Sequence, residues 1–395
     1  MENWGRLSHL FVVVFLSNFA TYVVNPAITD VIVDAVCGGK EECSLAIYLT
    51  GFQQAISGLG AVVMMPLIGN LSDVYGRKTL LLIPLMLSIF PSVILAWKRS
   101  TNFFYAYYGF KILTAMVTEG GVICLALAYL ADNVREEKRV SAFGILFGVV
   151  SAANVCGTLV ARLLSTTHIF QAAAAASIVA VAYVSLLLKE TTRHREPADL
   201  LEQPMLKPET AQNRESSKEI NFTRGIPSPM DIICLLKSSV AFSLLACVAF
   251  FNSLADAGIQ SFLLYFLKAR FHFKKDQFAD ILLLTYGGST LFFLPILGPL
   301  IGEEILLILG LFAGFLNMFL NSIAWSAWVP YASASLSILF SLATPNLYFC
   351  PRVHRFISLA LASSALDLLM CNANSILVSF AADRLYSEYI YKDTH

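Results

Sequence analysis

Charged side chains are scarce in this chain of 395 residues: Asp, Glu, Lys and Arg make up 14% of it, against about 25% in soluble globular domains. Hydrophobic residues make up 57%, and the mean hydropathy is +0.69. These numbers exclude a soluble globular protein and indicate an all-α polytopic membrane protein. The 27 basic and 27 acidic residues balance, so we expect no nucleic-acid partner. The partner that the composition does imply is the lipid bilayer.

Clustered cysteines are also lacking. The eight cysteines are scattered, and no Cys-x-x-Cys or Cys/His group has the spacing of a metal site. No nucleophile lies in a pattern with a general base. We therefore expect no metal, no cofactor and no enzymatic activity. Cys37 and Cys43 are the only close pair; they form a disulfide if their loop faces an oxidising compartment, and they stay free thiols if it does not.

Long apolar runs fill most of the chain, and each is long enough to cross a bilayer as a helix. We expect eleven such helices, at residues 7–28, 45–68, 79–97, 103–130, 140–164, 169–188, 240–266, 277–301, 305–323, 325–343 and 356–382. The polar segment 190–237 cannot bury a core, which predicts a disordered cytosolic linker. The linker separates an N-terminal bundle (1–189) from a C-terminal bundle (238–382), and a polar tail (383–395) follows.

A short polar stretch after the second run has a distinctive spacing. It reads Gly-x-x-x-Asp-x-x-Gly-Arg-Lys and comprises Gly69, Asp73, Gly76, Arg77 and Lys78. This pattern resembles the loop between helices 2 and 3 of the major facilitator superfamily. The resemblance implies two six-helix bundles, the second one incomplete here at about eleven helices in total. It also implies a secondary transporter that moves a small organic solute by alternating access, with this loop as a conformational latch.

A second polar stretch, after the fourth run, narrows the resemblance. Asp132 and the following segment up to Gly144, including Arg139, are similar to the 4–5 loop of drug:proton antiporters. Residues 5–346 resemble the tetracycline-efflux-like branch, which includes the hippocampus-abundant-transcript-like proteins. The resemblance implies proton coupling and adds Asp132 and Arg139 to the latch. Two departures stand out: no proline follows Gly157 in helix 5, and Lys111 stands where the family carries an arginine.

Beyond residue 346 the chain no longer looks like the family, and the twelfth helix is missing. We expect a plant-type member with a shortened or alternative C-terminus. The resemblance also places Asp73 at the cytosolic start of helix 11, where Arg352 and Arg355 offer partners. The alternative function is a truncated, non-transporting membrane protein that acts as a receptor, a chaperone or a dominant-negative variant.

Ionisable groups inside the apolar runs each cost about 2.5–3.5 kcal/mol on insertion scales, so each one implies a partner or a role. Lys111 and Glu119 are a little over two helical turns apart in the fourth run and share a face. Asp256 lies in the seventh run. Burial favours the uncharged form of a carboxyl group, so Glu119 and Asp256 are candidates for proton coupling, with Lys111 as counter-charge. The alternatives are a structural polar pair and, for Asp256, a solvated vestibule residue.

Neutral polar residues recur at helical spacing on several runs. The candidates for a substrate cavity are Asn18, Tyr22, Asn25, Gln53, Gln54, Asn154, Asn252, Gln260 and Tyr286. Interhelical hydrogen bonding explains any one of them equally well. As a set that points inward from several helices, they favour a polar central cavity.

If the N-terminus is cytosolic, the segments on the cytosolic side hold more Lys and Arg than the segments on the other side. Because cytosolic loops carry an excess of these residues, the bias predicts a cytosolic N-terminus. The sequons at Asn70 and Asn221 then face the cytosol, so we expect neither to be glycosylated; a glycan on either would invert the topology. An acidic dileucine pattern at residues 196–201 would direct the protein to an endosomal or vacuolar membrane if it is a sorting signal. If the pattern is a chance match, the plasma membrane is the expected location. We expect a monomer.

Overall fold

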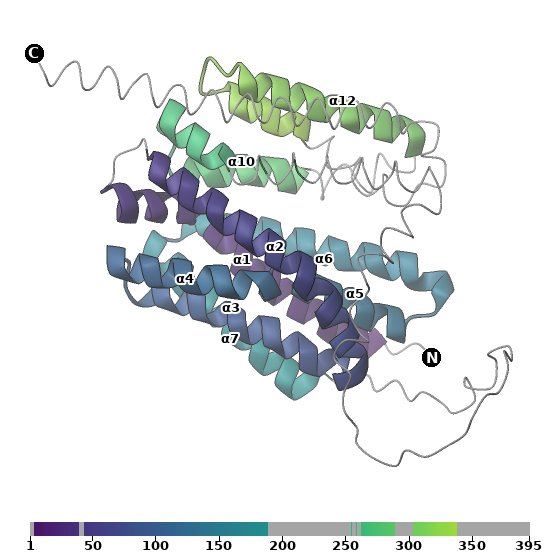
Figure 1. Cartoon of the computed structure of the whole chain (residues 1–395). Coiled ribbons are helices and arrows are strands. Elements are labelled where there is room, and N and C mark those ends of the chain that lie inside the picture. Colours follow the sequence, from purple (N-terminus) through teal and green to yellow (C-terminus); the bar gives the residue numbers. More distant parts are fainter. Residues whose placement is uncertain are drawn as a thin grey trace, which may run out of the picture.

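The computed structural model describes residues 4–38, 43–188, 254, 258, 262–288 and 303–337, and the regular structure within these residues is helical. Within this described part of the chain, six candidate spans are long and apolar enough to cross a membrane, and the axes of the helices run roughly parallel (Figure 1). The predicted linker, the eleventh helix, the polar tail, and the partners Arg352 and Arg355 all lie outside the described residues.

The N-terminal half holds seven helical elements within the described range 4–188. They are α1 (Trp4–Cys37), α2 (Ser44–Tyr75), α3 (Arg77–Trp97), α4 (Thr101–Thr118), α5 (Gly121–Asn133), α6 (Glu136–Leu163) and α7 (Thr166–Leu187). The predicted apolar runs therefore correspond to helices in this half, with ends that differ for identifiable reasons.

The first two helices are longer than their apolar runs. α1 has 34 residues, about 51 Å at 1.5 Å per residue, and it includes Asp30, which lies beyond the predicted end of the first run at residue 28. α2 continues to Tyr75, so the predicted loop between the runs 45–68 and 79–97 is reduced to Gly76, with φ 94°. Hydropathy marks where a helix leaves the hydrocarbon and does not mark where its hydrogen bonds end, so polar turns extend both helices beyond the predicted limits.

The fourth apolar run is one predicted helix but forms two, α4 and α5. The break falls at Glu119 and Gly120, and Gly120 has φ 80°. Residues that have a Cβ atom rarely adopt this left-handed conformation, so a glycine at this position permits the break. The two pieces still form a single candidate membrane span, Thr101–Asn133.

α1 is the centre of the N-terminal half and packs against both α6 and α7. α6 approaches α1 closely at Gly157. A Cβ atom there would lie 3.0 Å from the backbone nitrogen of Val23 and 3.2 Å from the carbonyl oxygen of Phe19. Backbone atoms cannot swing aside as a side chain can, so a larger residue has to push the two helices apart.

The substitution Gly157→Leu should therefore destabilise the protein by about 1–3 kcal/mol through overpacking. Thermal unfolding of the purified protein in detergent measures the effect as a lower melting temperature. Gly148→Leu is the matched control, because it lies on the same helix and a Cβ there meets nothing within 4 Å. Equal melting temperatures for the two variants would contradict the close contact between α1 and α6.

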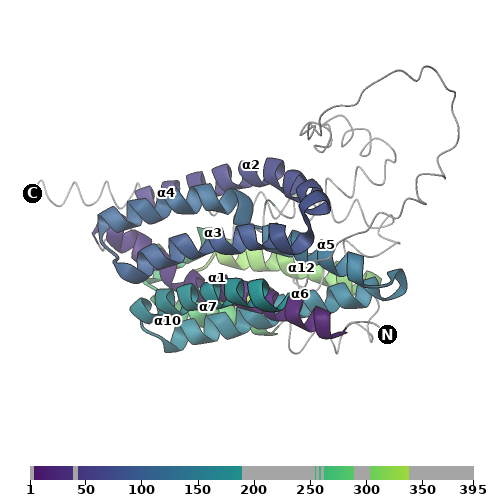
Figure 2. The ribbon, with the colours of Figure 1, turned by 90° about the horizontal axis from the view of Figure 1, so that it is seen from below.

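After the single described residues 254 and 258, the C-terminal half contains a helical segment at 262–271, α10 (Lys275–Gly288), α12 (Glu303–Ser322) and a helical segment at 329–337. α10 packs against α6 and α1, so the two halves meet there (Figures 1 and 2). A buried polar chain connects α12 to the last segment: Asn321 donates to Asn317 at 3.0 Å and accepts from Ser333 at 3.0 Å.

Candidate functional site

The motif at the α2–α3 junction holds its charges through contacts between helices. Arg77, the first residue of α3, donates from Nε to Oδ2 of Asp132 at the end of α5, at 3.0 Å. Its Nη1 donates to the hydroxyl of Ser72, which donates in turn to the carbonyl of Gly69 at 2.6 Å. The side chains of Arg77 and Asp132 are only 12% and 21% exposed, so solvent screens this pair less than a surface ion pair.

Two further cations bind backbone carbonyl groups at this end of the bundle. Lys78 donates from Nζ to the backbone carbonyl of Ser185 on α7 at 3.1 Å. Arg139 donates from Nε to the carbonyl of Val134 at 3.3 Å and so closes the turn between α5 and α6. Asp73 lies on α2, but its side chain and the predicted helix 11 fall outside the described residues. We call these residues (Gly69, Asp73, Gly76, Arg77, Lys78, Asp132 and Arg139) the latch.

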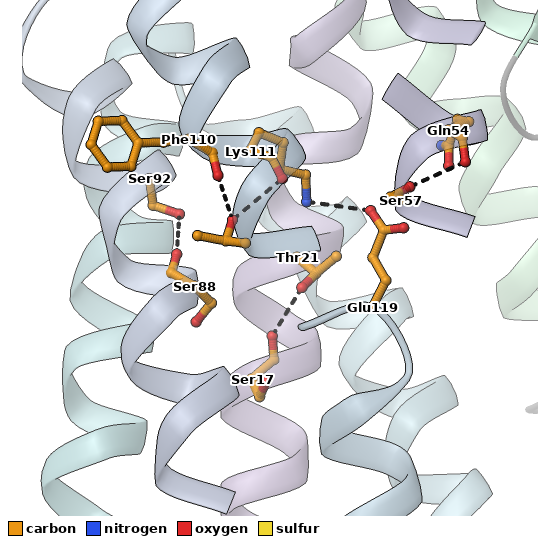
Figure 3. A network of polar contacts seen from close by, with 10 residues as sticks. Ser17, Thr21, Gln54, Ser57, Ser88, Ser92, Phe110, Lys111 and Glu119 are labelled. Atoms are coloured by element: carbon orange, nitrogen blue, oxygen red, sulfur yellow. Dashed lines mark hydrogen bonds and ion pairs between the residues drawn. The ribbon is translucent and has the colours of Figure 1, made fainter. Parts of the chain in front are cut away.

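The charged pair predicted in the fourth apolar run lies at the helix break. The Nζ of Lys111 and the Oε1 of Glu119 are 3.7 Å apart and point towards each other (Figure 3). Their side chains are 27% and 38% exposed. A distance of 3.7 Å is too long for a hydrogen bond. Within the described residues, this pair is therefore an ion pair without a direct hydrogen bond between the two charged groups.

This pair lies near the middle of the span Thr101–Asn133, at the depth where transporters bind their solutes with discontinuous helices. Figure 3 also shows neutral polar side chains of other helices, including Thr21 of α1 and Gln54 and Ser57 of α2. The hydroxyl of Thr21 donates to the carbonyl of Ser17 at 3.2 Å, and that of Ser57 to the backbone carbonyl of Gln54 at 3.2 Å. These hydroxyl groups donate their hydrogen bonds within their own helices. Lys111 and Glu119 are therefore the groups of this network that are best placed to bind a ligand.

The predicted cavity residues divide into three groups. Asn25 and Gln54 are exposed, and Tyr22, Gln53 and Asn18 are half-buried, although the Asn18 amide donates to its own helix at Val14 (2.8 Å). Asn154 is buried, and its Oδ1 accepts from Thr158 at 3.3 Å, so it belongs to the interior packing and not to an open surface. The side chain of Tyr286 and all of Asn252, Asp256 and Gln260 lie outside the described residues.

Two features of the site do not follow from the sequence. Arg77 and Asp132 belong to separate polar stretches, and the structure pairs them. The sequence is compatible with either free thiols or a disulfide at Cys37 and Cys43, and the structure joins them by a disulfide with a Cα–Cα distance of 6.0 Å. This disulfide lies at the end of the bundle opposite the latch, because it joins the end of α1 to the start of α2.

Comparison with known proteins gives consistent matches. A family model described as Major Facilitator Superfamily matches residues 10–371. The human hippocampus abundant transcript-like protein 1 is 26% identical over 359 residues, which cover 88% of this chain and 64% of that protein. The class H tetracycline resistance protein of Pasteurella multocida is 30% identical over 157 residues, which cover 39% of this chain and 38% of that protein.

Among solved structures, the crystal structure of a human organic anion transporter superposes with a TM-score of 0.61 at 16% identity. The match covers 97% of this chain and 94% of that chain. This likeness shows the fold alone. The chain spans less than two thirds of the length of the human relative that it matches, at 64%.

Proposed function

Since this chain belongs to the Major Facilitator Superfamily, we propose that it moves a small organic solute by alternating access and couples that movement to protons. The observation that carries the proposal is the Lys111–Glu119 pair at a helix break in the middle of a membrane span. It is a carrier and not an enzyme.

The energetics of the pair support proton coupling. Each charge in a spanning helix costs about 2.5–3.5 kcal/mol, and mutual attraction offsets that cost only while both groups stay charged and close. At 3.7 Å with partial exposure, the attraction between the two charges offsets only part of that cost. When Glu119 takes up a proton, Lys111 loses its counter-charge and gains affinity for an anionic group of a solute. Binding of the proton to Glu119 and binding of the solute to Lys111 are thereby coupled at one site.

The contacts of the latch support the proposal that the protein works by alternating movement of two bundles, 1–189 and 238–382. Arg77 and Asp132 join α3 to α5, and Lys78 joins α3 to α7, so this end of the N-terminal bundle moves as one body. Asp73, Gly69 and Gly76 complete the latch in this proposal.

Transport by the purified protein in proteoliposomes tests the proposal. The solute panel should include tetracycline and an organic anion, because the names of two similar proteins specify them, together with sugars and amino acids. We expect saturable uptake of one class that responds to an imposed pH gradient. Uptake that ignores the gradient would eliminate proton coupling. No uptake of any solute would favour a non-transporting membrane protein.

The proposal also includes the orientation, the location and the oligomeric state. The N-terminus is cytosolic, the membrane is the plasma membrane or an endosomal or vacuolar membrane, and the protein is a monomer. The Cys37–Cys43 disulfide supports it, because disulfides persist on the oxidising side of a membrane and this one lies opposite the latch. Asn70 lies at the latch end of α2. Mass spectrometry of the protein from its native membrane should therefore find no glycan there.

A further inference from the structure

The two halves of the chain contact each other at the end opposite the latch. Lys268 of the segment 262–271 forms an ion pair with Asp30 of α1, and their side chains are 13% and 24% exposed. Arg162 at the end of α6 donates from Nε to Oδ1 of Asp280 on α10 at 3.0 Å. α6 begins beside the latch at Glu136, so Arg162, near its other end, lies on the opposite side of the membrane span.

An apolar cluster lies next to the Asp30–Lys268 pair. Tyr265 is 6% exposed and packs into a cluster made otherwise by the N-terminal half, with Val31 of α1 and Phe104 of α4 among its members. Its hydroxyl is 2.8 Å from the hydroxyl oxygen of Thr50 on α2. Lys275, at the start of α10, donates to the carbonyl of Leu164 at the end of α6. Contacts from four helices of the N-terminal half, α1, α2, α4 and α6, thus hold the other half at this end.

The disulfide supports the same contacts. Cys43 caps the start of α2, where its sulfur accepts from the backbone N–H of Ala46 at 3.4 Å, and it belongs to the cluster that holds Tyr265. Its bond to Cys37 joins α1 to α2. α1 carries Asp30 and α2 carries Thr50, the partners of Lys268 and Tyr265. The covalent link therefore holds the two helices that bind the segment 262–271 at a constant spacing.

We propose that the ion pairs Asp30–Lys268 and Arg162–Asp280, with Tyr265 beside them, form a gate that closes the site from the side opposite the latch. The Cys37–Cys43 disulfide braces this gate. The proposal rests on the alternating access proposed above and adds which residues close the second opening. Partly exposed ion pairs suit this role because water can replace each partner when they separate, whereas a fully buried pair would leave an uncompensated charge.

The reactivity of a reporter cysteine at Gln54 tests the gate. Gln54 is exposed and lies one helical turn deeper on α2 than Thr50. In a background that keeps only Cys37 and Cys43, Gln54→Cys is labelled with a membrane-impermeant maleimide added from the side of the disulfide. We expect Asp30→Lys, and separately Arg162→Asp, to raise the labelling rate on the order of tenfold, a typical conformational coupling. The swaps Asp30→Lys/Lys268→Asp and Arg162→Asp/Asp280→Arg should restore slow labelling.

A misfolded variant cannot explain rescue by a second charge reversal, so the swaps separate gating from instability. Lys98→Asp is the matched control, because Lys98 is exposed at the same end and no contact to the other half is seen for it in the described residues. Labelling that stays slow in the single reversals, or that stays fast in the swaps, would overturn the gate. Replacing Cys37 and Cys43 by serine should also speed labelling; an unchanged rate would overturn the bracing role.

Labelling is measured without any solute, so it gives an answer whether or not transport is found. Rescue by the swaps in a protein that moves no solute would support the gate and count against the proposed function. Gradient-driven uptake with no effect of charge reversal on labelling would support the function and overturn the gate.

Discussion

Glu119→Gln should remove the response of transport to a pH gradient, so that gradient-driven accumulation falls on the order of tenfold or more. Glutamine has nearly the shape of a protonated glutamate but cannot release a proton. The variant is therefore held in one of the two states that coupling requires. Exchange of labelled for unlabelled solute needs no net proton movement and should persist.

Uptake with and without an imposed gradient, compared with solute exchange on the same vesicles, measures this effect. Asp34→Asn is the matched control, because it removes one carboxylate from an exposed position at the end of α1, far from the pair with Lys111. If Glu119→Gln accumulates solute as well as the unmodified protein, the proton is carried by another group, and Asp256 is the next candidate. Loss of both accumulation and exchange would indicate a structural ion pair.

Asp132→Asn should slow transport on the order of tenfold by weakening the latch. The change removes the charge that faces Arg77 at 3.0 Å, where the two side chains are only 21% and 12% exposed. A hydrogen bond between charged groups contributes about 1.5–3 kcal/mol to stability, and partial exposure lowers that value. The melting temperature should therefore fall only slightly while the exchange between states changes strongly.

Solute exchange and thermal unfolding of the same preparation separate these two effects. Asp132→Glu keeps the charge and should recover much of the activity, because the longer side chain can still reach the guanidinium group of Arg77. Arg135→Ala is the matched control in the same turn, because Arg135 is exposed and makes no side-chain cap contact with α6. A large loss of stability with normal exchange per folded protein would mean that the pair is structural and not part of a latch.

The positions of the N-terminal spans were predictable because hydropathy depends on local composition. A run of about twenty apolar residues has one low-energy arrangement in a bilayer, a spanning helix. The motif from Gly69 to Lys78 was recognisable for a similar reason, since its spacing is visible without any tertiary contact. The break at Glu119 and Gly120 was not predictable, because two adjacent glycines permit a left-handed residue but do not require one.

The sequence by itself determined the membrane class, the superfamily and the need of each intramembrane charge for a partner. Only the tertiary structure decided which partner each charge takes. Arg77 pairs with Asp132 across 55 positions, and Lys268 pairs with Asp30 across 238. The physical reason is that the cost of an unpaired charge is a property of the residue and the membrane, whereas the pairing depends on which helix ends the packing brings together.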